Sequence, residues 1–141
     1  MNRVEIDPVW LMHVQKPARY VGGEWNSVMK NHADVDVKVA LAFPDVYEVG
    51  MSHLGLKIIY SVINSRKDAL AERVYTPWVD MEKMMRERNI PLYALESKAP
   101  IKDFDVLGLT MPYEMCYTNI LNMIDLSGIP VPVSYTHLRA H

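Results

Sequence analysis

The sequence predicts an α/β domain with a mainly parallel sheet and helices on its faces. Two short apolar runs, residues 35–43 and 103–111, begin after acidic residues and stop abruptly before prolines. Runs of this length and composition are typical of strands that are buried on both faces. Each is followed by a stretch in which apolar residues recur at helical spacing. Strands that alternate with helices favour parallel pairing.

Composition limits the classes of function. The chain has 141 residues, half of them hydrophobic, which is enough for one core. Its 15 basic and 17 acidic residues are scattered, so no nucleic-acid or anionic-membrane footprint is expected. No segment is long and apolar enough to span a bilayer and no signal peptide opens the chain, so a cytoplasmic location is expected. A single cysteine excludes an internal disulfide framework and an all-cysteine metal site.

The first half of the chain predicts an extension, a strand and a helix. Residues 1–34 contain two prolines and a Gly-Gly pair without a sustained period, which indicates an irregular N-terminal extension with one short helix. The strand at 35–43 ends before a polar loop. The helix after it is expected to turn its apolar residues towards the sheet, and these are Gly55, Ile58, Ile59, Val62 and Ile63.

The second half repeats this pattern. Residues 71–78 predict a second strand and 91–97 a third. Between them Asp80 is expected to cap a helix that ends at 89–91 and whose inner face is Met81, Met84 and Met85. After the strand at 103–111, the last helix is expected to end at Gly128 and to bury Tyr117, Ile120, Leu121 and Ile124.

Two polar loops follow the apolar strands. They are "PDVYEVG" at 44–50 and "TMPYEMC" at 110–116. Ligands of open α/β sheets bind at the carboxyl ends of the strands, so the two loops are candidates for one site. Glu48 and Glu114 either meet there as an acid–base pair or remain solvated, the commoner arrangement for loop carboxylates. No glycine-rich phosphate-binding motif is present.

Two further side chains have a functional and a plain interpretation. His53, at the start of a predicted helix, is a metal ligand or, more commonly at such a position, a capping or surface residue. Cys116 opens the last predicted helix, where a thiol can be activated; without a base beside it, a small buried apolar residue is the better interpretation.

The first loop carries a recognisable spacing. Asp45-x-Tyr47-x-x-Gly50 follows a buried strand and precedes a helix. It resembles the D-x-H-x-x-G signature of cobalamin-binding domains, with Tyr47 in the position of the histidine. In that family the histidine coordinates cobalt, the aspartate orients it, and the glycine permits a tight loop beside the corrin. The family's S-x-L element falls at Thr110-Met111-Pro112, where only the hydroxyl is kept.

The resemblance extends over residues 14–131. "VQKPARYVGGEWNS", "VALAFPDVYEVGMSHLGLKI", "AERVYTPWVDME" and "YTNILNMIDLSGIP" resemble the N-terminal part of a cobalamin-binding-domain-containing family of radical S-adenosylmethionine (SAM) proteins. The resemblance implies a flavodoxin-like, three-layer domain of the cobalamin-binding type at 35–132, truncated before its last strand. Residues 133–141, "VSYTHLRAH", resemble translated adapter sequence, and we expect a non-native tail there.

The resemblance also implies a function. Family members carry C-x-x-x-C-x-x-C in a following domain, which holds a [4Fe–4S] cluster and SAM. That motif is absent here, so no self-contained active site is expected, and the partner would be the radical SAM domain of the same full-length chain. The module would present cobalamin or substrate to that domain from Asp45, Tyr47, Gly50, Thr110 and Glu114.

The tyrosine leaves several interpretations open. A phenol is mostly protonated at neutral pH and is a poor replacement for imidazole at cobalt. The domain either binds cobalamin without a protein ligand below the metal, or binds another flat or nucleotide-like group, or has lost the cofactor. In the last case it is a cofactor-free structural or interaction module.

Overall fold

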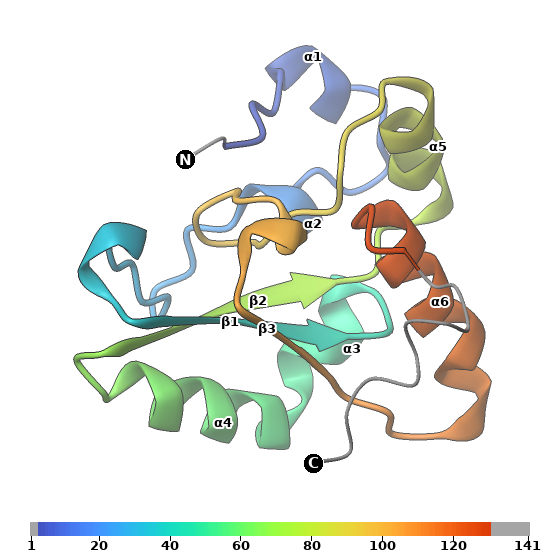
Figure 1. Ribbon diagram of the computed structural model, residues 1–141. Helices are drawn as coiled ribbons and strands as arrows, with labels where there is room; N and C mark the ends of the chain where they lie inside the picture. Colours follow the sequence, from blue (N-terminus) through green and yellow to red (C-terminus); the bar gives the residue numbers. More distant parts are fainter. Residues whose placement is uncertain (1–2, 131–141) are drawn as a thin grey trace.

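The computed structural model describes residues 3–130, which form a three-stranded parallel sheet with helices on both faces (Figure 1). β1 (Val37–Phe43) lies between β2 (Ala69–Tyr75) and β3 (Val106–Leu109), and both pairings are parallel. The predicted α/β class is confirmed, and the order β2-β1-β3 is consistent with a flavodoxin-like domain. The expected non-native tail lies outside the described residues.

Each face of the sheet has its own apolar cluster. α3 (Tyr47–Ser52) and α4 (Leu54–Asn64) follow β1, and Leu56 and Tyr60 of α4 pack on Leu41 and Phe43. On the opposite face α5 (Val79–Glu87) and α6 (Tyr117–Leu126) contribute Met81, Met85, Met123 and Leu126 to a cluster around Ala40 and Ala42. Figure 1 shows α4 on one side of the sheet and α5 on the other.

The inner faces of two helices differ from the predicted ones. In α4 Leu56 and Tyr60 are buried, whereas Ile58, Ile59 and Val62 are about half exposed or more. α4 carries apolar residues around most of its circumference, so the spacing alone does not select the face. In α6 the buried residues are Met123 and Leu126, whereas Tyr117 and Leu121 are exposed.

Two other local predictions are wrong. Residues 91–97 do not form a strand: they form a loop in which Tyr93 makes a single antiparallel bridge to Pro100. This loop crosses the edge of β2, where Leu95 N donates to Arg73 O at 2.8 Å. The N-cap of α5 is Trp78, not Asp80, whose carboxylate instead accepts from Gln15 N at 2.8 Å.

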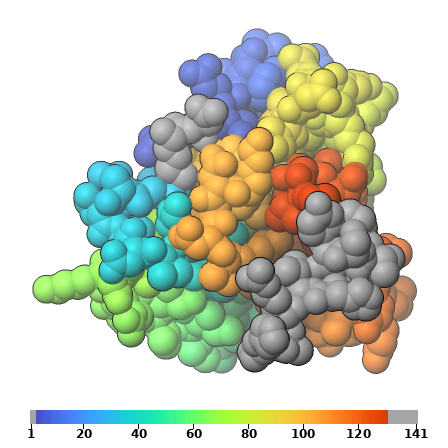
Figure 2. Space-filling view, in the orientation of Figure 1, coloured from blue at the N-terminus to red at the C-terminus, as the bar shows by residue number. Residues whose placement is uncertain are grey.

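The N-terminal extension packs along the domain. It contains α1 (Pro8–Leu11), α2 (Ala18–Val21) and the 3-10 turn η1 (His32–Asp34), where one short helix was predicted. Its residues, blue to cyan, lie along the top and left of the molecule in Figure 2. Val14 and Tyr20 are buried in the core, and Lys30 Nζ donates to the carbonyls of Asn64, Arg66 and Ala69 at 2.6–3.0 Å.

Two further 3-10 turns flank β3. η2 (Ile101–Asp103) precedes it and η3 (Glu114–Cys116) leads into α6. Among residues 3–130, β3 pairs only with β1, and Val106 at its start is 47% exposed. The edge of β2 is covered, and all seven of its residues are buried. In the part of the chain that the structure describes, the sheet is therefore covered on the side of β2 and has no further strand beyond β3.

Candidate functional site at the carboxyl ends of the strands

The loops after β1 and β3 are linked at the carboxyl edge of the sheet. Tyr113 Oη donates to Asp45 Oδ2 at 3.2 Å, and Asn119 Nδ2 donates to the carbonyl of Pro44 at 2.9 Å. Asp45 Oδ1 also accepts from Val46 N at 2.7 Å. Because of these bonds, the Asp45 carboxylate is oriented by both loops.

The other predicted residues of the second loop lie apart from this bond. Thr110 directly follows β3, and its N–H donates to Ala42 O at 3.0 Å. Glu114 opens η3 and is exposed. Glu48 does not pair with it: it accepts from Arg19 at 2.9 Å and Lys16 at 2.9 Å, both in the N-terminal extension. These bonds, that to Arg19 above all, lower the pKa of Glu48 to about 2.

Tyr47 is turned towards the N-terminal extension. Its hydroxyl donates to the carboxylate of Glu24, and its ring meets Tyr75 edge-on at 5.4 Å between centroids. Burial, and then the bond to Glu24, raise the pKa of Tyr47, so the phenol remains protonated. The phenol oxygen of Tyr47 is thus bonded to a carboxylate of the same chain.

Gly50 permits close packing inside the domain. A Cβ at this position would lie 2.5 Å from two ring carbons of Tyr75 and 3.0 Å from Phe43 Cδ1. These distances are too short for any side chain, so a glycine is needed for α3 to approach β1 and β2. In this structure the space that the glycine leaves is filled by Tyr75.

A buried ionic network connects this loop with β2. Arg73 donates to Glu24 and, at 2.6 Å, to Glu96, and its guanidinium lies 4.9 Å from the Tyr60 ring centroid. Burial acts against the charge of Arg73, but the two carboxylates outweigh it and raise the pKa. A second pair, His32 with Glu72 at 2.5 Å, lies along the same strand. Glu72 and Arg73 lie in the strand predicted at 71–78, but sequence spacing does not identify their partners.

The plain interpretations of His53 and Cys116 are confirmed. His53 is the N-cap of α4, where Nδ1 accepts from Leu56 N at 3.1 Å. Cys116 is a free thiol and fully buried. Among residues 3–130 no three histidine, cysteine or acidic side chains are placed to hold a metal ion. No helix in this part of the chain is long and apolar enough to cross a membrane.

Exposed apolar side chains follow all three strands at this edge. Met111, Tyr113, Met115 and Tyr117 come after β3 and are 45–83% exposed. Val49 comes after β1 and Trp78 after β2; they are 44% and 41% exposed. Sequence reasoning missed this group because it assigned Tyr117 to the core and attended only to the polar loop residues. We call these six residues the carboxyl-edge group.

Comparison with known proteins gives a family match. The family model described as "Radical SAM proteins, N-terminal" matches residues 55–136, more than half of the chain. Neither a curated protein nor a solved structure matches. The match includes the strands β2 and β3. It also includes the helices that pack on the two faces of the sheet, α4 on one face and α5 and α6 on the other. The chain therefore belongs to the family of radical SAM protein N-terminal regions.

Proposed function

We propose that this domain is an accessory module that presents cobalamin or the substrate to a radical SAM domain of the same full-length chain. The carboxyl-edge group carries the proposal: its apolar side chains are exposed after each strand, at the edge where α/β sheets bind ligands. Exposed apolar groups of this kind mark interaction sites, and methionine adapts readily to a partner surface. The [4Fe–4S] cluster and SAM would both lie in the partner domain.

Cobalamin is the proposed cofactor, and when bound it would supply a carrier for methyl transfer. Asp45, Thr110 and Glu114 are the polar groups that we assign to its cradle. The bond between Tyr47 and Glu24 supports a binding mode in which Tyr47 does not coordinate cobalt. In such a mode Tyr47 and Gly50 would shape the loop from inside the domain, and Asp45 would orient Tyr113 rather than a ligand of the metal.

A second candidate function is a cofactor-free module for packing between domains. It is favoured by the internal partners of the signature residues. Asp45 is bound to Tyr113, Tyr47 to Glu24, and the space beside Gly50 is filled by Tyr75. In this case the carboxyl-edge group would contact the partner domain directly.

Visible absorbance distinguishes the two functions. The full-length protein is incubated with hydroxocobalamin, desalted, and its spectrum recorded. Retained corrin absorbance supports cobalamin presentation; its complete loss supports the cofactor-free module. Where corrin is retained, we expect the wild-type spectrum to lack a protein nitrogen ligand. Tyr47→His should then shift the spectrum only if residue 47 can turn from Glu24 to cobalt. Met12→His, at an exposed residue of the N-terminal extension outside the carboxyl-edge group, is the control.

A further inference from the structure

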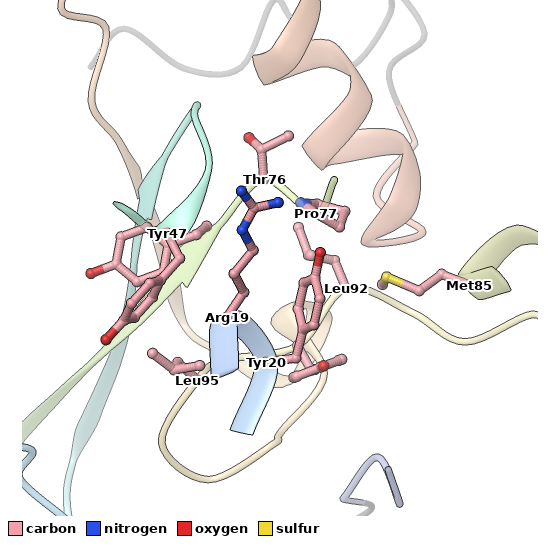
Figure 3. A pocket seen from close by; sticks show the side chains of 10 residues that line it. Arg19, Tyr20, Tyr47, Thr76, Pro77, Met85, Leu92 and Leu95 are labelled. Atoms are coloured by element: carbon pink, nitrogen blue, oxygen red, sulfur yellow. The ribbon is translucent and has the colours of Figure 1, made fainter. Parts of the chain in front are cut away.

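A small cavity lies beyond the carboxyl end of β2, between that strand and the N-terminal extension. Its volume is about 30 Å³. Arg19 and Tyr20 of α2 extend into the middle of the group that surrounds it, with Tyr47 on one side and Leu92 and Met85 on the other (Figure 3). The cavity is thus formed where the extension, the 91–97 loop and β2 meet.

Two hydroxyl groups in the wall of this cavity have no protein partner. Thr76 Oγ1 and Tyr93 Oη are both buried, and neither is hydrogen-bonded to another described residue. Tyr93 as a whole is only 7% exposed. Burying a hydroxyl without a partner is costly, and such groups are rare in folded proteins. Two in one cavity therefore point to a ligand that can both donate and accept.

The electrostatics of the wall favour a neutral ligand. The charge of Arg19 is already met by Glu48. Burial raises the pKa of both Tyr20 and Tyr93, so these phenols remain neutral. Tyr20 Oη accepts from Trp78 N at 3.1 Å and keeps its own proton to donate. An anion would find no uncompensated positive charge here, and a cation no free carboxylate among the lining residues.

The volume decides the size of the ligand. A buried water needs a cavity of roughly 10–15 Å³, so this cavity of about 30 Å³ has room for about two waters. A drug-sized ligand needs a pocket about ten times larger than this one. We propose that this cavity is a hydration site that holds about two water molecules, bonded to Thr76 Oγ1 and Tyr93 Oη. The waters join the end of β2 to the 91–97 loop, through two hydroxyls that have no other partner among the described residues.

Tyr93→Phe tests the proposal because the sign of its effect depends on whether the cavity is wet. If water is bound, the substitution removes one of its partners and should lower Tm by about 3–6 °C. If the cavity is dry, the substitution removes an unpaired buried hydroxyl and Tm should rise or stay unchanged. Tyr117→Phe, which alters an exposed tyrosine, should leave Tm unchanged in both cases.

A second substitution and a direct measurement complete the test. Thr76→Val removes the other hydroxyl but keeps the shape of the side chain, and it should also lower Tm. Thr76→Ser keeps the hydroxyl and should lower Tm less than Thr76→Val does. In the wild-type protein, water-to-amide nuclear Overhauser effects should reach the backbone at Thr76 or Tyr93. A rise in Tm for both Tyr93→Phe and Thr76→Val, or the absence of such effects from residues in this wall, would overturn the proposal.

Discussion

The hydroxyl of Tyr47 donates to the carboxylate of Glu24, which also receives a bond from Arg73. The bond joins the loop after β1 to the N-terminal extension, in which Glu24 precedes Tyr47 by 23 residues. The phenol oxygen of Tyr47 is thus used inside the domain. The loop is therefore held in place by the extension, and its conformation should depend on this bond.

Tyr47→Phe tests how much this bond contributes. Hydrogen bonds to charged groups contribute about 1.5–3 kcal/mol, so we expect the free energy of unfolding to fall by about 2 kcal/mol in urea titrations. Tyr113→Phe is the matched control, because Tyr113 also donates to a carboxylate but is 45% exposed and should cost less than about 1 kcal/mol. Equal losses in the two variants would contradict a special role for the Tyr47 bond.

Gly50→Ala should be among the most destabilising single-methyl additions in the chain. The new Cβ would lie 2.5 Å from the Tyr75 ring, which cannot retreat without moving β2. Overpacking of this kind costs about 1–3 kcal/mol, measurable by thermal or urea unfolding. Gly108→Ala is the control: its nearest neighbour, Leu41 Cδ2, is at 3.4 Å, so the added methyl should be tolerated. Unchanged stability of Gly50→Ala would mean that α3 can shift away from the sheet.

The elements of the fold could be predicted from local signals, but their orientations could not. β1 and β3 follow from short apolar runs, and the stop signals at Asn89 and Gly128 follow from residue types that tolerate positive φ, here 54° and 67°. The buried face of α4 does not follow from its spacing, because it includes Tyr60, whose hydroxyl accepts a hydrogen bond from Val28 N. That partner lies in the extension, for which the sequence indicated no regular structure.

For the candidate site, the position of the two loops could be predicted from the sequence, but the partners of their side chains could not. The position of the two loops at one edge follows from parallel pairing, and the structure links them. The partners of Tyr47 and Glu48 lie in residues 16–24, and no spacing rule connects them. Glu96 was placed in a predicted strand, but it is buried as a partner of Arg73, a role that only tertiary contact reveals.

Lys30→Met should loosen the N-terminal extension. Lys30 Nζ donates to three carbonyls at the end of α4 and the start of β2, and these would lose their charged donor. We expect unfolding stability to fall by about 1–3 kcal/mol and trypsin to cleave the extension faster in the native state. Lys83→Met is the control, because among residues 3–130 the one ion pair of Lys83 is an exposed pair with Glu87 at 3.9 Å. Equal cleavage of both variants would count against the role of Lys30.

The contribution of Glu48 to the stability of the fold should decrease as the pH falls. Its pKa in the folded protein is about 2, below its ordinary value of 4.5, so its pairing with Arg19 stabilises the fold above pH 4.5. That contribution is lost as the pH falls from 4.5 to 2. The carboxylate is 41% exposed, so the contribution is small, less than about 1 kcal/mol. The stability difference between wild type and Glu48→Gln should therefore shrink between pH 5 and 3, and also in 1 M salt at pH 7. A difference that is constant with pH would contradict the assignment.

Met115→Lys tests whether the carboxyl-edge group contacts the partner domain in the full-length protein. Met115 is 83% exposed, so the substitution should leave the Tm of this domain unchanged. A charge placed in a buried interdomain contact would be desolvated without a partner, and the two domains should separate more readily. We expect faster limited proteolysis between the domains and a larger radius of gyration in solution scattering. Met12→Lys is the control, because Met12 is also 83% exposed but lies in the N-terminal extension, outside the carboxyl-edge group. If the two variants give the same proteolysis and scattering, the carboxyl edge is not the surface that meets the radical SAM domain.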